Sequence, residues 1–160
     1  MGVATQRISR HACKWRLALI EISAPFLLNN ISMPGSYDYF KADIKQHFLS
    51  HVSVQSKILD VGAGCGTYAV LLKPEYQLDA VEIWDEYIHR FNLHSLYNNV
   101  FSVDILSFDF SDYDYLIFGD VLEHISVESA QMLLEKINDT GKRCIVAVPY
   151  LLEQGVCEGN

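Results

Sequence analysis

Four carboxylates follow four short hydrophobic segments in the middle of this 160-residue chain. Asp60 lies near the end of the first segment, Glu82 follows the second, Asp104 the third and Asp120 the fourth. A single acidic residue at such a place is common, because carboxylates cap helices and are well solvated in loops. Four of them at successive segment ends indicate an acidic cleft, which favours a positively charged ligand and repels a diphosphate.

A glycine-rich turn, Gly62-Ala-Gly-Cys-Gly66, comes directly after the first hydrophobic segment. Glycine lets a backbone approach a ligand closely, although a tight strand-to-helix turn also needs glycine. The turn departs from the dinucleotide pattern G-x-G-x-x-G/A, because its last position is Thr67. This departure and the acidic cleft disfavour an NAD-dependent oxidoreductase. S-adenosylmethionine carries a sulfonium and an ammonium, which fit an acidic cleft.

Alternating strand and helix patterns place these acids at one edge of a sheet. Short hydrophobic runs predict strands, and hydrophobic residues at helical spacing predict the helices between them. This alternation predicts an α/β fold with a mostly parallel sheet of about five strands and helices on both faces. Ligands of such folds bind beyond the carboxyl ends of the strands. The expected strands are 57–61, 78–81, 99–103, 113–118 and 144–148, and the expected helices between them are 67–73, 85–94 and 126–138.

The first 50 residues are expected to form an N-terminal helical segment and lid, and residues 51–160 the core of a single domain. Segment 15–22 has hydrophobic residues at helical spacing. An acidic residue and Pro25 interrupt the hydrophobic stretch, so we interpret it as a packing helix and not as a signal peptide or a membrane span. A second helix is expected at 37–50.

Composition narrows the class of partner. The formal net charge is −8, and there is no run of Lys or Arg, so we expect no nucleic acid. Half of the residues are hydrophobic, which is enough for a sizeable core. The cysteines form no CxxC pair, which favours reduced thiols in a cytoplasmic protein. The sequence contains no Cys/His cluster, so we expect no metal site. The cysteines are Cys13, Cys65, Cys144 and Cys157.

The succession of motifs resembles class I S-adenosylmethionine-dependent methyltransferases over roughly residues 55–150. Ile58-Leu-Asp-Val-Gly-Ala-Gly-Cys-Gly-Thr67 is similar to motif I of that family, and Asp79-Ala-Val-Glu82 to the acidic strand end that follows it. Val103-Asp104-Ile105 resembles the adenine-contacting segment, and Phe118-Gly-Asp-Val-Leu-Glu-His-Ile125 resembles the fourth motif. The resemblance implies a Rossmann-like core, S-adenosylmethionine as cofactor, and methyl transfer to an unidentified acceptor. The acidic composition favours a small-molecule acceptor.

The resemblance also implies which residues contact each part of the cofactor. The ribose would be held by Glu82, and the adenine would be contacted by Asp104, by the Ile105 backbone, and by Ile83 and Trp84 at its flanks. Core packing stays open as a second interpretation of Ile83. The methionine part would be contacted by Asp60, Gly62, Ala63, Gly64 and Asp120.

The residues after the fourth expected strand are the candidates for catalysis. Methyl transfer needs positioning, and it needs a general base only when the acceptor is protonated. His124 is the candidate base and Asp120 lies near the acceptor, while a structural role for His124 at the start of the next helix stays equally open. Glu123 is expected to face solvent or to cap that helix. Surface packing is the favoured interpretation of Tyr37 and Tyr39, with a lid over the cofactor as the alternative.

The C-terminal part is shorter than in the family that the chain resembles. Class I methyltransferases usually have seven strands, whereas this sequence stops 11 residues after Pro149. We therefore expect the C-terminal strands to be missing and the fifth strand to leave an apolar edge, through which a homodimer is possible. A truncated or non-catalytic module that binds the cofactor and acts through a partner is the alternative to an enzyme.

Overall fold

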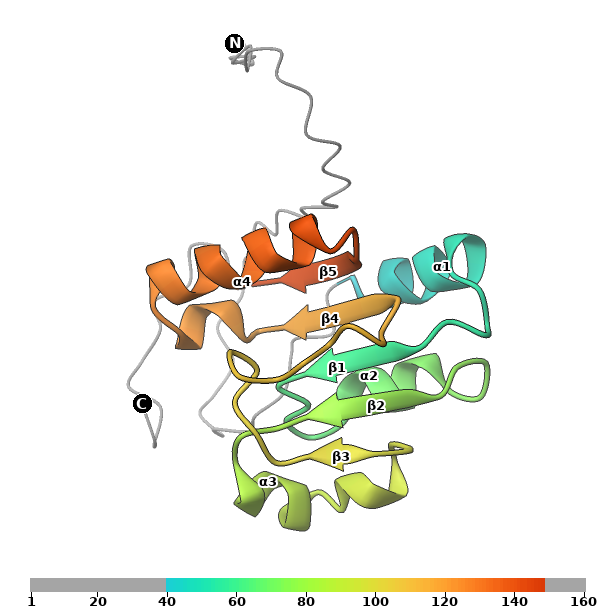
Figure 1. Cartoon of the computed structure of the whole chain (residues 1–160). Coiled ribbons are helices and arrows are strands. Elements are labelled where there is room, and N and C mark those ends of the chain that lie inside the picture. Colours follow the sequence, from blue (N-terminus) through green and yellow to red (C-terminus); the bar gives the residue numbers. More distant parts are fainter. Residues whose placement is uncertain (1–39, 149–160) are drawn as a thin grey trace, which may run out of the picture.

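A five-stranded parallel sheet organises residues 40–148, the part of the chain that the computed structural model describes (Figure 1). The strand order is β3-β2-β1-β4-β5, and every pairing is parallel. The prediction of a parallel sheet of about five strands is therefore confirmed. The strands are β1 (Ile58–Val61), β2 (Leu78–Val81), β3 (Val100–Phe101), β4 (Tyr115–Gly119) and β5 (Arg143–Ala147).

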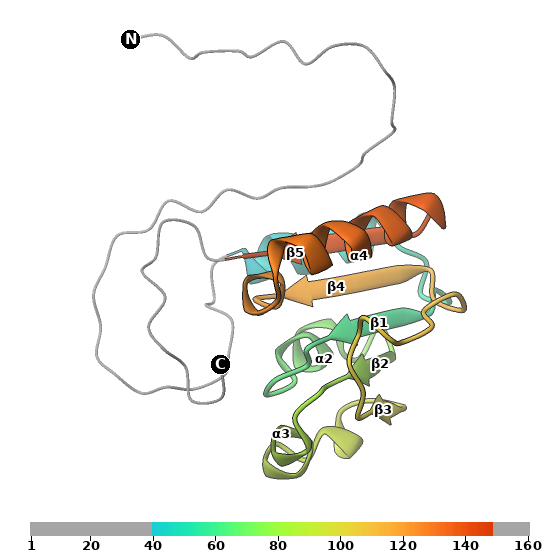
Figure 2. The ribbon, with the colours of Figure 1, turned by 60° about the vertical axis from the view of Figure 1, so that its left-hand side comes forward.

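Helices cover both faces of the sheet, as predicted (Figure 2). α1 (Lys41–His51) and α2 (Thr67–Leu72) pack on one face, and α4 (Val127–Asp139) packs on the other. Residues 102–114 follow β3 without a helix and cover part of the α4 face. The remaining helical elements are α3 (Asp85–Arg90) and the short 3-10 helices η1 (Leu93–Ser95) and η2 (Leu122–His124).

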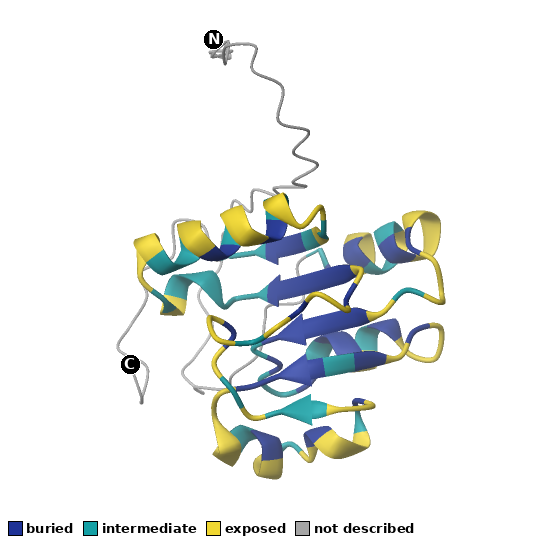
Figure 3. Cartoon of the chain, in the orientation of Figure 1, coloured by how far each residue is buried: buried dark blue, intermediate teal, exposed yellow. Residues whose placement is uncertain are grey.

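Figure 3 shows that the central strands are buried, and the sheet divides the core into two hydrophobic clusters. Successive strand residues point to opposite faces, so Ile58 packs with α1 while Leu59 packs with α4. All four residues of β1 are buried, because β1 lies in the centre of the sheet and is covered on both faces. The helix α1 belongs to this core through Ile44 and Phe48.

Strand order places β1 between β2 and β4, and the chain leaves β1 toward β2 but crosses back to β4 later. The order of the strands therefore reverses between β1 and β4. Parallel sheets of this kind form a crevice outside the carboxyl ends of the strands at the point of reversal. The residues that follow β1, β2 and β4 are therefore the first candidates for ligand binding.

Two predicted elements differ from the structure. The helix predicted at 85–94 is wrong beyond Arg90, because Asn92 adopts a left-handed conformation with φ 49° and α3 gives way to η1. Asparagine adopts this conformation more readily than most residues. The strand predicted at 99–103 pairs only at β3, because its partner β2 ends at Val81, opposite Phe101. Other boundaries shift by a few residues, as helix and strand ends commonly do.

Several predictions lie outside the described residues, including the packing helix at 15–22 and the roles of Tyr37 and Tyr39. Within residues 40–148, Cys65 and Cys144 are free thiols. None of the helices in this range has the length and hydropathy needed to cross a membrane. β5 is an edge of the sheet that these residues form, and a homodimer through it stays a prediction.

Candidate ligand site at the carboxyl ends of the strands

Three charged side chains are buried among residues 40–148, and all three lie at the carboxyl end of the sheet. Asp60 lies in β1, Glu82 directly follows β2, and Lys41 reaches the same end from α1. A buried charge is unfavourable unless a partner compensates for it. Their concentration in one place marks this end of the sheet as a site for charged groups.

Glu82 fastens the glycine turn to the end of β2. Its Oε2 accepts a hydrogen bond from the Gly64 amide at 2.9 Å, and its Oε1 accepts one from the Trp84 amide at 3.0 Å. The Gly62 amide adds a bond of 2.8 Å to the Val81 carbonyl. A carboxylate oxygen can accept more than one hydrogen bond. Glu82 is therefore held in one orientation. Its oxygens can still accept the further hydrogen bonds that the predicted contact with ribose needs.

Glycine is required at two positions of the site by close approach of side chains. Gly62 has φ +66°, and a Cβ there would lie 2.5 Å from Cγ2 of Val121. A Cβ at Gly119, the last residue of β4, would lie 2.2 Å from Cε2 of Tyr68. The buried ring of Tyr68 thus rests against the carboxyl end of β4. The two glycines let Val121 and Tyr68 approach the backbone at the carboxyl ends of β1 and β4.

Asp60 is the buried acid nearest to the centre of the sheet. The Tyr97 hydroxyl donates a hydrogen bond of 2.5 Å to its Oδ2. Burial raises the pKa of Asp60 to about 7, while Tyr97 and Lys41 act to lower it and Glu82 acts to raise it. Burial and the Asp60 carboxylate raise the pKa of Tyr97, so its hydroxyl stays protonated and donates. Asp60 therefore changes its charge near neutral pH.

Lys41 is a site residue that the sequence analysis missed. Its Nζ donates a hydrogen bond of 3.0 Å to the Tyr68 hydroxyl and lies 4.2 Å from the centre of the Tyr68 ring. The one signal in the sequence was its spacing, because Lys41, Ile44 and Phe48 lie on one face of α1 at i, i+3 and i+7. A lysine on the hydrophobic face of an expected helix is unusual.

The predicted adenine contacts divide into exposed and buried residues. Ile83 and Trp84 are 58% and 45% exposed, so the interpretation of Ile83 as a core residue is wrong. Asp104 is exposed, and its Oδ1 accepts a hydrogen bond of 2.9 Å from the Leu106 amide. Ile105 is buried in the cluster on the α4 face. These residues follow β2 and β3, which are neighbours, and their role toward adenine stays a prediction.

Asp120 directly follows β4 in a left-handed conformation with φ 58°. This conformation is unfavourable for most side chains and tends to persist where the surroundings demand it. Its amide donates a hydrogen bond of 2.8 Å to the Ala147 carbonyl, which joins the ends of β4 and β5. The backbone of Asp120 is therefore held in an uncommon conformation at the predicted acceptor side of the site.

Glu123 is only partly exposed, and the interpretation of it as the cap of α4 is wrong. Its Oε2 is buried and has no hydrogen-bond partner among residues 40–148. Burial, with a smaller contribution from the nearby Asp120, raises the pKa of Glu123 to about 7. The cap of α4 is Ser126, whose side chain accepts from the Ser129 amide at 3.1 Å. His124 is exposed in η2, and its two interpretations stay open.

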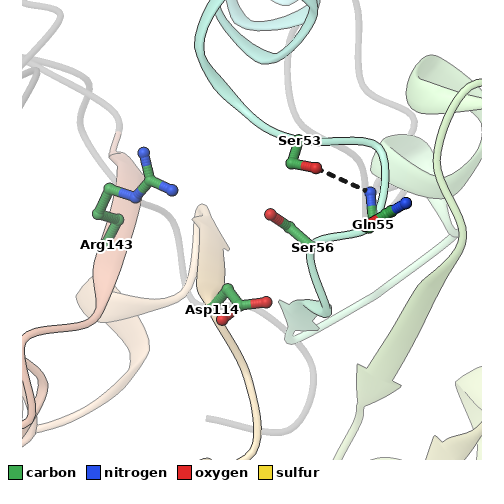
Figure 4. A pocket seen from close by; sticks show the side chains of 5 residues that line it. All are labelled: Ser53, Gln55, Ser56, Asp114 and Arg143. Atoms are coloured by element: carbon green, nitrogen blue, oxygen red, sulfur yellow. Dashed lines mark hydrogen bonds between the residues drawn. The ribbon is translucent and has the colours of Figure 1, made fainter.

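A separate hollow of about 260 Å³ lies at the opposite end of the sheet (Figure 4). Asp114 precedes β4 and Arg143 begins β5, so this hollow opens at the amino ends of the strands. It lies away from the buried charges and is no part of the candidate site. No group of three or more potential metal ligands occurs within the described part of the chain. The hollow is lined by Ser53, Gln55, Ser56, Asp114 and Arg143.

A protein-family model matches most of the chain. The model of the family described as "Methionine biosynthesis protein MetW" matches residues 41–153. This range includes every element described above and all residues of the candidate site. A search of curated proteins finds no match.

Solved methyltransferase structures share the fold at low sequence identity. The amino pentose methyltransferase CalS10 from Micromonospora echinaspora, with bound SAM, has a TM-score of 0.56 and 13% identity, covering 72% of this chain and 52% of that one. A SAM-dependent methyltransferase from Archaeoglobus fulgidus has a TM-score of 0.53 and 20% identity, covering 69% and 54%. Magnesium protoporphyrin IX methyltransferase from Synechocystis, with bound SAM, has a TM-score of 0.51 and 16% identity, covering 59% and 49%. The fold is therefore that of class I methyltransferases, and this chain spans about half the length of these three.

Proposed function

This chain belongs to the MetW family, and from that premise we propose that it binds S-adenosylmethionine at the carboxyl end of its sheet and transfers the methyl group to a small-molecule acceptor. The proposal is carried by one observation, the burial of Asp60 and Glu82 beside a glycine turn. When ionised, carboxylates buried at this end of the sheet attract the positive sulfonium and ammonium groups and repel a pyrophosphate, because charges interact more strongly away from water.

The shape of the turn supports a nucleoside ligand. Gly62 and Gly64 both have positive φ, a conformation that glycine adopts readily, so the chain makes a tight turn at the carboxyl end of β1. Glu82 is already oriented by two backbone amides, so binding needs little further ordering of this side chain. Two of the methyltransferases that share the fold are described with bound SAM, which agrees with the same ligand here.

We assign the parts of the cofactor to the residues around the turn as follows. The methionine end lies at Asp60, the glycine turn and Asp120, and the ribose lies at Glu82. The exposed hydrophobic side chains that follow β2 flank the adenine, whose amino group meets Asp104. The full set of proposed contacts is Asp60, Gly62, Ala63, Gly64, Glu82, Ile83, Trp84, Asp104, Ile105 and Asp120.

The cofactor, when bound, supplies a methyl group that positive sulfur has already activated for displacement. The residues of this chain then have to align the acceptor with that methyl group and keep water out, since alignment alone can lower the barrier by about 7–11 kcal/mol. Asp120 faces the acceptor side in our proposal. His124 takes a proton when the acceptor carries one at neutral pH.

A second function is a cofactor-binding module without catalysis that acts through a partner. The observation in its favour is that the buried acids Asp60 and Glu82 are both assigned to the cofactor, whereas His124, the candidate base, is exposed. Both functions require the same cofactor contacts and differ only in turnover. Binding and turnover must therefore be measured separately.

Isothermal titration calorimetry with S-adenosylmethionine and S-adenosylhomocysteine tests the binding step. We expect both ligands to bind, and we expect Asp60→Ala and Glu82→Ala each to weaken binding by roughly tenfold or more. Glu135→Ala is the control, because Glu135 is an exposed acid of α4. Absence of binding at millimolar ligand would overturn the proposal.

An assay for S-adenosylhomocysteine release, run over a panel of small-molecule acceptors, then tests turnover. Release that depends on an acceptor and is reduced in Asp120→Ala supports an enzyme. Binding without release across the panel supports the non-catalytic module instead.

A further inference from the structure

Lys41 is the only Lys or Arg that is buried in the described range, with 8% of its surface exposed. Lysine is almost never fully buried without compensation, because its ammonium is strongly hydrated. Here the Tyr68 hydroxyl accepts a hydrogen bond from Nζ at 3.0 Å, and the Tyr68 ring faces the same ammonium at 4.2 Å. The ammonium is therefore held in a defined place.

That place is the candidate site. Tyr68 lies in the first turn of α2, two residues after Gly66, and its ring rests against Gly119 at the carboxyl end of β4. The Lys41 ammonium is close enough to Asp60 to lower the pKa of that carboxyl. A buried cation and the buried anions thus share one end of the sheet.

Helix α1 is firmly attached to the core, so the position of Lys41 does not depend on a loose segment. Phe48 is fully buried, and the Tyr76 hydroxyl donates hydrogen bonds to the Phe48 and Val52 carbonyls at 2.8 and 2.9 Å. Lys41 is the first residue of this helix. The helix therefore positions one ammonium at the site in a reproducible way.

We propose that the Lys41 ammonium binds the carboxylate at the amino-acid end of the cofactor, so that the site selects ligands that keep this carboxylate. The inference rests on the proposed function, because it presumes that S-adenosylmethionine is the ligand. Its amino-acid end is a zwitterion, with an ammonium and a carboxylate on one carbon. Asp60 and Glu82 alone would attract the ammonium but repel the carboxylate, and Lys41 supplies the opposite charge that the carboxylate needs.

The alternative is that Lys41 serves only as a counter-charge for Asp60. The two roles differ in the ligands they affect. A binding role makes Lys41 matter only for ligands with a carboxylate. A purely structural role makes it matter equally for every ligand of the site, since the whole site would be disturbed.

The experiment is calorimetry of wild type, Lys41→Met and Lys41→Arg with two ligands, S-adenosylhomocysteine and its decarboxylated analogue. We expect Lys41→Met to weaken S-adenosylhomocysteine by roughly tenfold to a hundredfold and to leave the analogue almost unchanged or bound more tightly. Lys41→Arg keeps the charge and should keep most of the affinity. Lys45→Met is the matched control, because Lys45 lies one turn further along α1 in a partly exposed ion pair with Glu75; it should change neither affinity.

Equal weakening of both ligands in Lys41→Met, or no weakening of either, would overturn the proposal. Circular dichroism checks that the variant folds, and Lys41→Gln replaces it if it does not. The wild type provides a test without any variant, because the acidic residues alone would favour the more positive decarboxylated analogue. Wild-type protein that binds the analogue as tightly as S-adenosylhomocysteine contradicts the role of Lys41. Wild-type protein that binds neither ligand contradicts the proposed function itself.

Discussion

Replacing Asp60 by asparagine is expected to stabilise the protein at pH 8, although it removes a charge that the ligand needs. Burial raises the pKa of this carboxyl from 3.8 to about 7 in the folded protein. Between these two values the folded protein keeps a proton that the unfolded chain has released. The free energy of unfolding of the wild type therefore falls as pH rises from about 4 to about 7.

The size of this effect follows from the two pKa values. The difference between 3.8 and about 7 corresponds to about 4 kcal/mol of unfolding free energy above pH 7. Roughly 3 kcal/mol of this loss falls between pH 5 and pH 8. Asparagine does not ionise, and its side-chain oxygen can still accept the hydrogen bond from Tyr97. The free energy of unfolding of Asp60→Asn should therefore not fall with pH through this residue, as that of the wild type does.

Urea unfolding followed by circular dichroism at pH 5, 6, 7 and 8 measures the effect. The difference in unfolding free energy between Asp60→Asn and wild type should grow with pH in favour of the variant, while S-adenosylhomocysteine affinity falls at pH 8. Glu123 also has a raised pKa, but it is present in both proteins, so its contribution cancels in the difference. A difference that stays constant within about 0.5 kcal/mol across this range would refute the raised pKa of Asp60.

Three further changes test the geometry around the crevice. Asp120→Gly should relieve the left-handed backbone at φ 58° and raise the unfolding free energy by about 1 kcal/mol, while calorimetry shows weaker S-adenosylhomocysteine binding. Gly119→Ala places a Cβ 2.2 Å from Cε2 of Tyr68 and should lower the free energy of unfolding in urea by about 1–3 kcal/mol. Tyr68→Ala should destabilise the Gly119→Ala protein less than it destabilises the wild type, because it removes the clashing ring. The side chain in Glu82→Gln keeps only one oxygen, so it can accept from only one of the two backbone amides, those of Gly64 and Trp84. This variant should lower the free energy of unfolding by about 2 kcal/mol in the same assay. A melting temperature equal to that of wild type would contradict each of these last two expectations.

Most of the sheet was predictable because buried parallel strands are continuous hydrophobic runs. The prediction for β2 matches residue for residue at Leu78–Val81, and β1 differs by one residue. The third strand was predicted too long because hydrophobicity does not reveal pairing. Only Val100 and Phe101 form strand pairs, with Ala80 and Val81, since β2 ends at Val81.

The positions that could be predicted from the sequence are those that follow directly from the order of the strands. The acids that follow the strands are fixed in place by the strands themselves, so their spacing along the chain was sufficient to predict them. Lys41 and Tyr97 approach Asp60 through tertiary packing, and Tyr97 lies 37 residues away from it. The burial of Glu123 likewise depends on how η2 folds back after Asp120, which no local pattern encodes.

The central strand also governs how the chain can fold. β1 pairs on one side with β2 but on the other with β4, and the Lys57 amide bonds Asp114, 57 residues later. During synthesis, one edge of β1 therefore stays unpaired until β4 has been translated. Contacts between such distant residues slow folding, and an open hydrophobic strand invites aggregation in the meantime. Refolding yield is accordingly expected to fall with protein concentration, even though each strand is short.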